Sequence, residues 1–127
     1  RVVNLRSGVI GNTLTMDMIS WDDFAQVELR VGTVVSAEVF ENARNPAYIL
    51  HIDCGAELGI LKSSAQITDL YEPDDLIDRQ VVCVVNFPSK QIGHIQSQCL
   101  VTGFPQEDGS VVLIAPDQPV ANGLRLS

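Results

Sequence analysis

The sequence predicts an all-β protein built on a five-stranded barrel of the OB-fold type, with short helices and extensions at both ends. Three observations support this fold class. Apolar runs of about five to eight residues alternate with turns rich in glycine, proline and aspartate, as in sandwiches and closed barrels. The first run, residues 27–40, is longer and contains Gly32. One short helical segment comes before the fourth strand, an arrangement that favours an OB-fold barrel.

The chain enters the barrel through a short helix. Ser20 is followed three residues later by Asp23, which is the pattern of a helix-capping box and predicts a helix as far as about Gln26. Apolar and polar residues then alternate over residues 27–40, the period of a half-buried strand. Gly32 inside this strand indicates a bulge or a sharp coil of the kind found at barrel corners.

Turn signals separate the remaining strands. The segment 68–78 is rich in acids and contains Pro73, which predicts a short helical turn followed by an exposed acidic loop. Further turns or loops are predicted at residues 41–46, 55–59, 103–109 and 116–123, and further strands at residues 48–54, 60–64, 80–86, 98–102 and 111–115.

Length and charge limit the classes of function. The 127 residues suit a single domain, which we place at residues 16–127. The formal charge of −8 argues against broad binding to nucleic acid or to an anionic membrane. No apolar run approaches the roughly 18 residues of a membrane helix, so membrane insertion is not expected. A local basic patch would draw on Arg30, Arg44, Lys62, Arg79, Lys90 and Arg125.

Residues 1–15 are expected to be an N-terminal extension outside this domain. They contain two arginines and no acid, and turn-forming residues interrupt any apolar stretch, unlike a secretory signal. Met16 and Met18 both fit a natural start. We expect either an added edge strand or a contact with a neighbouring chain to hold the extension.

The cysteines and histidines indicate no metal site, cofactor or catalysis. Cys54, Cys83 and Cys99 are odd in number, lack metal-ligand spacing and lie in or beside apolar runs. This pattern predicts buried, reduced thiols in a cytoplasmic protein. His51 and His94 have no neighbouring nucleophile or ligand spacing. The chain is therefore not expected to be an enzyme.

The polar segment between the strands 80–86 and 98–102 is the candidate binding site, with a plain hairpin connection as the alternative. Phe87 is suited to stack on a base or a peptide side chain, or else fills the core. Lys90 is suited to pair with a phosphate or a carboxylate, or else is a solubilising surface lysine. Asn86 offers a donor and an acceptor, or else caps the turn after its strand.

Four motifs in order resemble the CsaA-type export chaperones of the tRNA-binding-domain family, which also includes the C-terminal appendage of some methionyl-tRNA synthetases. The resemblance covers about residues 19–126. The motifs are Leu29-Arg30-Val31-Gly32-Thr33-Val34, Lys62-Ser63-Ser64-Ala65-Gln66-Ile67, Val84-Val85-Asn86-Phe87-Pro88 and Pro116-Asp117-Gln118-Pro119-Val120-Ala121-Asn122-Gly123.

The resemblance implies an OB-fold homodimer that is joined through segments at both ends of the barrel. It implies a chaperone that holds segments of unfolded pre-proteins for export, with the export machinery as a further partner. The alternative is a tRNA-binding protein that recognises tRNA shape through the same face. The resemblance and the residue chemistry together give the candidate binding residues Arg30, Arg44, Pro46, Ala47, Lys62, Ser63, Ser64, Asn86, Phe87, Pro88, Lys90, Ile92 and Ser97.

Two basic residues that are usual in this family are replaced here. Gln91 follows Lys90, and Gln96 comes before Ser97. Each lost phosphate contact removes roughly one unit from the slope of log affinity against log salt concentration. This departure favours the peptide role over the tRNA role. Arg30 is expected to point outward from its strand, toward the binding face.

Overall fold

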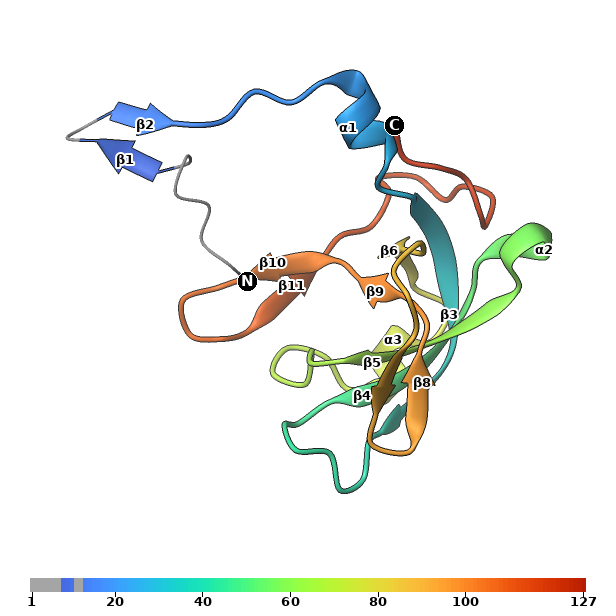
Figure 1. Cartoon of the computed structure of the whole chain (residues 1–127). Coiled ribbons are helices and arrows are strands. Elements are labelled where there is room, and N and C mark those ends of the chain that lie inside the picture. Colours follow the sequence, from blue (N-terminus) through green and yellow to red (C-terminus); the bar gives the residue numbers. More distant parts are fainter. Residues whose placement is uncertain (1–7, 11–12) are drawn as a thin grey trace.

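The computed structural model describes residues 8–10 and 13–127. Within these ranges the chain is mostly β-structure, and five antiparallel strands in the order β5-β4-β3-β6-β9 curl into a nearly closed barrel (Figure 1). This confirms the predicted fold class. The barrel strands are β3 (Leu29–Val39), β4 (Tyr48–Asp53), β5 (Ile60–Ala65), β6 (Gln80–Val84) and β9 (Leu100–Val101).

The long strand β3 is the centre of the sheet and pairs with β4 on one side and β6 on the other. Its register against β4 shifts between Val34 and Ser36, so the bulge lies there and not at Gly32 as expected. Gly32 serves close packing instead. A Cβ atom at this position would lie 2.5 Å from Cγ2 of Ile52 and 2.9 Å from Sγ of Cys54.

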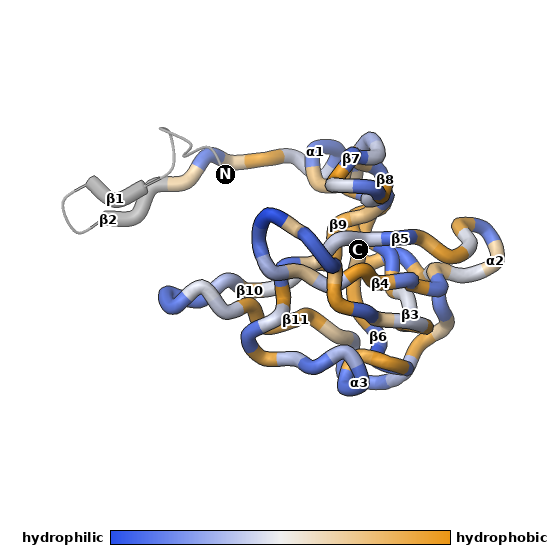
Figure 2. Tube along the Cα trace, turned by 90° about the horizontal axis from the view of Figure 1, so that it is seen from below, coloured by the Kyte–Doolittle hydropathy of each residue, from blue (hydrophilic) through white to orange (hydrophobic). Residues whose placement is uncertain are grey.

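The barrel core is formed by the inward side chains of the alternating strands. Leu76 on the short helix α3 (Pro73–Leu76) is fully buried at one end of the core, while Asp74 and Asp75 on the same helix are exposed, as expected for this acidic segment. Figure 2 shows apolar residues along the strands and polar residues in the turn between β10 and β11. The buried core consists of Val34, Tyr48, Leu50, Ile52, Cys54, Ala65, Ile67, Leu76, Val81, Cys83 and Cys99.

Two short helices flank the barrel strands. Helix α1 (Trp21–Ala25) begins at the predicted capping box, in which the Ser20 side chain accepts from the Asp23 N–H and the Asp23 side chain accepts from the Ser20 N–H. Helix α2 (Gly55–Leu58) occupies the predicted turn between Gly55 and Gly59. In the described part of the chain, no helix is long and apolar enough to cross a membrane.

Two hairpins occupy segments that were predicted wholly or partly as loops, namely the candidate binding segment and the 103–109 turn, the latter together with the predicted strand 111–115. Strands β7 (Lys90–Ile92) and β8 (Ile95–Ser97) pair within the candidate binding segment. Strand β10 (Gly103–Pro105) starts inside the predicted 103–109 turn and pairs with β11 (Val111–Leu113). The 103–109 prediction was wrong in extent, because the turn itself occupies only the second half of this segment.

At the N-terminus, β1 (Gly8–Ile10) pairs with β2 (Thr13–Thr15) and with no barrel strand among the described residues. The expected added edge strand is therefore absent from these two segments, and the same expectation for residues 1–7 and 11–12 falls outside the described residues. At the other end, the C-terminal segment runs beside β3. The Val31 N–H donates to the Leu124 carbonyl at 3.0 Å, and the Leu126 N–H donates to the Leu29 carbonyl at 2.9 Å.

Candidate binding groove

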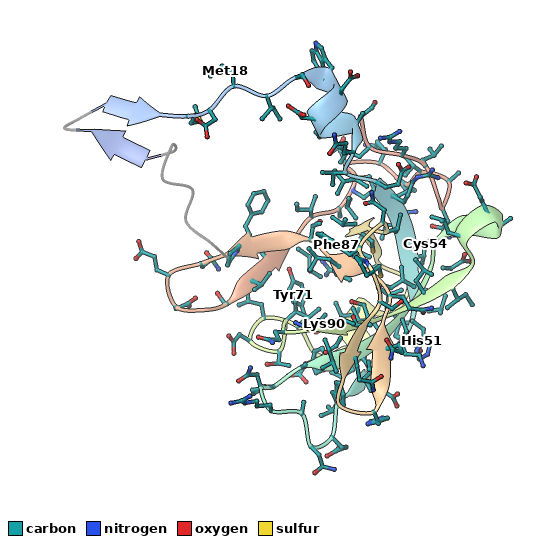
Figure 3. All side chains as sticks on the ribbon, in the orientation of Figure 1. Met18, His51, Cys54, Tyr71, Phe87 and Lys90 are labelled. Carbon is teal, nitrogen blue, oxygen red and sulfur yellow. The ribbon has the colours of Figure 1, made fainter. Side chains whose placement is uncertain are left out.

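A groove of about 540 Å³ lies beside the β7–β8 hairpin, where the chain leaves β6 and returns to β9. Phe87 and Lys90 both line it, on the same side of the molecule (Figure 3). We call it the Phe87 groove. Its lining residues are Ser64, Phe87, Pro88, Ser89, Lys90, Ile92, Ser97, Gln98, Cys99 and Leu100.

The hairpin that forms one wall is held by a small second core. Ile95 of β8 is buried against Phe40, Ala47 and Ile49 on the outer side of the barrel. The hairpin turn contains Gly93, whose φ of 56° lies in the left-handed region that favours glycine. A rigid support of this kind fixes the position of the groove relative to β4.

The groove presents two apolar side chains to solvent. Phe87 is 57% exposed and Leu100 is 50% exposed, from opposite ends of the segment that joins β6 to β9. Ile92 is half-buried beside them. Apolar groups grouped in a concave site gain free energy when a ligand covers them, so the groove is suited to an apolar group of a ligand.

The electrostatics of the groove differ from those of the chain as a whole. Lys90 is the only charged side chain among the residues described as lining it, although the chain carries a net charge of −8. The other polar groups are the hydroxyls of Ser64, Ser89 and Ser97 and the amide of Gln98. The groove therefore offers one positive charge, neutral hydrogen-bonding groups and an apolar floor.

Strands β5 and β9 meet beneath the groove without forming a ladder of paired residues in the described structure. The 97–99 segment bridges them. The Ser64 N–H donates to Oγ of Ser97 at 3.1 Å, and the Lys62 N–H donates to Oε1 of Gln98 at 2.9 Å. The Ser63 hydroxyl donates to the Cys99 carbonyl at 2.9 Å, so this predicted binding residue is 1% exposed and closes the barrel.

Asn86 fixes the start of the loop. Its Oδ1 accepts from the Glu28 N–H at 2.9 Å, and its Nδ2 donates to the Gln26 carbonyl at 2.7 Å. Both ends of the amide thus hold the chain segment between α1 and β3. This is neither of the two roles considered for it, because its partners lie about 60 residues away in sequence.

Arg30 is directed to the C-terminal segment. Its Nη1 donates to the Gly123 carbonyl at 2.9 Å, and its Nη2 lies 2.8 Å from Oε1 of Glu28. Its side chain is 20% exposed and does not line the groove. The expectation that Arg30 points outward toward the binding face is therefore corrected, because the carbonyl and the carboxylate hold its guanidinium.

The remaining predicted residues lie outside the groove. Arg44 and Pro46 are exposed in the loop before β4, and Ala47 is buried in the second core beneath the hairpin. Lys62 stands opposite His51 across the β4–β5 pair, and Nδ1 of His51 lies 2.9 Å from Oγ of Ser36. The structure thus brings together six of the predicted residues, namely Ser64, Phe87, Pro88, Lys90, Ile92 and Ser97.

The sequence reasoning missed Ser89, Gln98, Cys99 and Leu100 as groove residues. A signal for Leu100 was present, since alternation in the predicted 98–102 strand puts Leu100 and Cys99 on opposite faces. Cys99 is buried as predicted, together with Cys54 and Cys83.

The buried thiols contact one another. Hydrogen bonds with the thiols of Cys54 and Cys99, together with burial, raise the pKa of the Cys83 thiol well above its ordinary value. Among the described residues, no group of three or more histidine, cysteine or acidic side chains is arranged to hold a metal ion.

A second exposed apolar region lies where the two termini of the domain meet. Two hollows of about 680 and 430 Å³ there share Trp21 and Phe24 of α1. Trp21 is 89% exposed. We call this the terminal apolar surface and define it by Ile19, Trp21, Phe24 and Leu126.

Comparison with known proteins shows which family and which relatives this chain resembles. The profile of the family described as "Putative tRNA binding domain" matches residues 29–125. The methionine–tRNA ligase of Flavobacterium psychrophilum is 32% identical over 108 residues, which are 84% of this chain and 15% of that enzyme. The chain thus spans about 15% of the length of such curated relatives.

Two solved structures are similar over their whole length. The chaperone CsaA from Bacillus anthracis superposes with a TM-score of 0.82 at 49% identity, covering 87% of this chain and 100% of that one. The CsaA chaperone protein from Picrophilus torridus superposes with a TM-score of 0.80 at 41% identity, with the same coverage of both chains.

Proposed function

The chain belongs to the tRNA-binding-domain family, and from this premise we propose that it is a non-enzymatic, cytoplasmic binding protein that holds unfolded pre-protein segments for export. The ligase activity of the longer relatives is not part of the proposal, since the match covers only about 15% of their length. The proposed site is the Phe87 groove.

The observation that carries the proposal is the pair of half-exposed apolar side chains in one groove. Phe87 and Leu100 are each at least half exposed, and Ile92 lies beside them. Burying an apolar side chain of this size contributes about 1.5–3 kcal/mol when the burial is complete. An unfolded polypeptide supplies apolar side chains of the matching kind, and the serine hydroxyls accommodate its backbone. The names of the two chaperone structures support the same direction.

tRNA binding is the second candidate, and the description of the family favours it. In this role Phe87 stacks on a base and Lys90 contacts a phosphate. The groove offers one lysine, while Gln91 and Gln96 stand where the family usually has basic residues. A single charge gives a weak dependence of affinity on salt and little phosphate-driven affinity.

The proposal includes a homodimer formed through the terminal apolar surface. Trp21 is almost fully exposed, and Leu126, which is 42% exposed, lines the same hollow. Large apolar groups grouped in this way mark interaction surfaces. A symmetric pair of chains would carry two Phe87 grooves, so one long client would bind both with a raised effective concentration. The export machinery is proposed as the destination of the client.

The test compares a peptide with tRNA on the same protein. The affinities of a fluorescent peptide from an unfolded pre-protein and of a tRNA transcript are measured by anisotropy from 50 to 400 mM salt. The proposal expects a peptide affinity that changes little with salt and is lowered by Phe87→Ala. If the peptide does not bind while tRNA binds with a steep salt dependence that Lys90→Glu abolishes, the tRNA role replaces the chaperone role.

A further inference from the structure

The Phe87 groove continues into a second hollow. This hollow has a volume of about 260 Å³ and shares Ser64 and Leu100 with the groove. It extends the concave surface past the end of β5 toward β11. Its lining residues are Ser64, Ala65, Gln66, Ile67, Leu100, Val101 and Val111. We call the groove and this hollow together the seam track.

The seam track follows the junction at which the barrel is not closed by paired strands. On this junction, β5 is joined to the 97–98 segment partly through side chains, Oγ of Ser97 and Oε1 of Gln98, instead of through a regular ladder. The edge N–H groups of Lys62 and Ser64 are thus already bound, so an extended ligand lies over this junction, in the two hollows, and is held there mainly by contacts with the lining side chains.

The charge along the seam track is confined to one end. Lys90 is the only charged residue among the described residues that line either hollow. At the other end the lining is apolar or neutral, with Ile67, Val111 and the amide of Gln66. A ligand with one negative group next to an apolar group matches this distribution, and a ligand with negative charges at regular intervals does not.

From this distribution we propose that the seam track selects an extended polypeptide segment with a carboxylate next to a bulky apolar residue. The apolar side chain lies between Phe87 and Leu100, the carboxylate pairs with Nζ of Lys90, and the backbone continues along β5 past Gln66. The inference rests on the proposed function, since it names the class of client that the same groove takes. The preference proposed for the groove is opposite to that of the rest of the chain, whose net negative charge favours basic segments of a client.

The charge preference is tested with three fluorescent peptides that differ at one position. Each carries the same apolar residue followed by Asp, Asn or Lys. With the full chain at 150 mM salt, the Asp peptide is expected to bind about two- to fivefold tighter than the Asn peptide, which is the range for a solvent-exposed ion pair. The Lys peptide is expected to bind weakest. In Lys90→Glu the order is expected to reverse.

A matched pair of variants separates a local contact from the general charge. Lys90→Gln and Gln91→Glu each take the formal charge from −8 to −9. Gln91 is exposed on the same strand but does not line the groove. Lys90→Gln is expected to remove the discrimination among the three peptides, and Gln91→Glu is expected to keep the order. Equal effects of the two variants would overturn the proposed contact.

The path of the ligand is tested with a second matched pair. Leu100→Ser is expected to lower the affinity for the Asp peptide severalfold. Phe104→Ser, at a 64% exposed residue of β10 outside both hollows, is expected to leave this affinity unchanged. Thermal unfolding of both variants confirms that they fold. If all three peptides bind equally and Phe87→Ala weakens them equally, the proposed function stands and this inference fails. If none of them binds and tRNA does, the proposed function itself fails.

Discussion

Phe87→Ala is the substitution that separates a binding role from a structural role most sharply. The side chain is 57% exposed in the free protein, so a ligand has that fraction of it left to cover. Complete burial of a phenylalanine side chain contributes about 1.5–3 kcal/mol. The exposed fraction corresponds to about 0.9–1.7 kcal/mol, and its loss raises the dissociation constant of a pre-protein peptide by about five- to eighteenfold.

The assay is fluorescence anisotropy with the full chain, and the matched control is Phe104→Ala. Phe104 is 64% exposed on β10 and lies outside the Phe87 groove. The two variants lose the same side chain from surface positions of similar exposure, so their effects on folding are expected to be similar and small. A loss of affinity in Phe87→Ala alone is predicted. An unchanged dissociation constant in Phe87→Ala, or an equal loss in both variants, would refute the placement of the site.

Four further predictions concern assembly, packing, thiol chemistry and salt. Trp21→Ser is expected to weaken dimerisation at least tenfold by sedimentation velocity, and a parent chain that stays monomeric at micromolar concentration would contradict the proposed dimer. Gly32→Ala is expected to lower the free energy of unfolding by about 1–3 kcal/mol in urea titrations, since its Cβ would meet Ile52 at 2.5 Å. The three thiols are expected to react with a disulfide reagent only at the rate of unfolding, because all are buried and the pKa of Cys83 is raised; rapid labelling of the folded chain would contradict this. Peptide affinity is expected to fall less than twofold between 100 and 300 mM salt, whereas a decline of ten times or more would indicate a phosphate-binding site.

The barrel was predictable because its signals are local. The alternation over residues 27–40 and the capping box at Ser20 each lie within one continuous segment, and both appear in the structure. The β7–β8 hairpin had a local signal as well, a Gly93-containing turn between Ile92 and Ile95, but the polar residues around it favoured a loop.

The other parts depend on contacts between distant residues, which one sequence does not reveal. Arg30 alternates with apolar neighbours and so was expected to point outward toward the binding face, but its partner Gly123 is 93 residues away. Ser63 resembled its neighbour Ser64 in sequence, yet closure of the barrel against Cys99 buries one and leaves the other in the groove. Gly32 was assigned to a bulge because a glycine inside a strand often marks one. The actual reason for the glycine, the close approach of Ile52 from β4, depends on tertiary packing and is not visible in the sequence.

The most direct test of the central claim is a map of amide chemical-shift changes as an unfolded pre-protein peptide is added to the ¹⁵N-labelled chain. The largest changes are predicted at Ser64, Phe87, Lys90 and Leu100, with the terminal apolar surface around Trp21 unchanged. Changes confined to the terminal apolar surface, with the groove residues unmoved, would contradict the account.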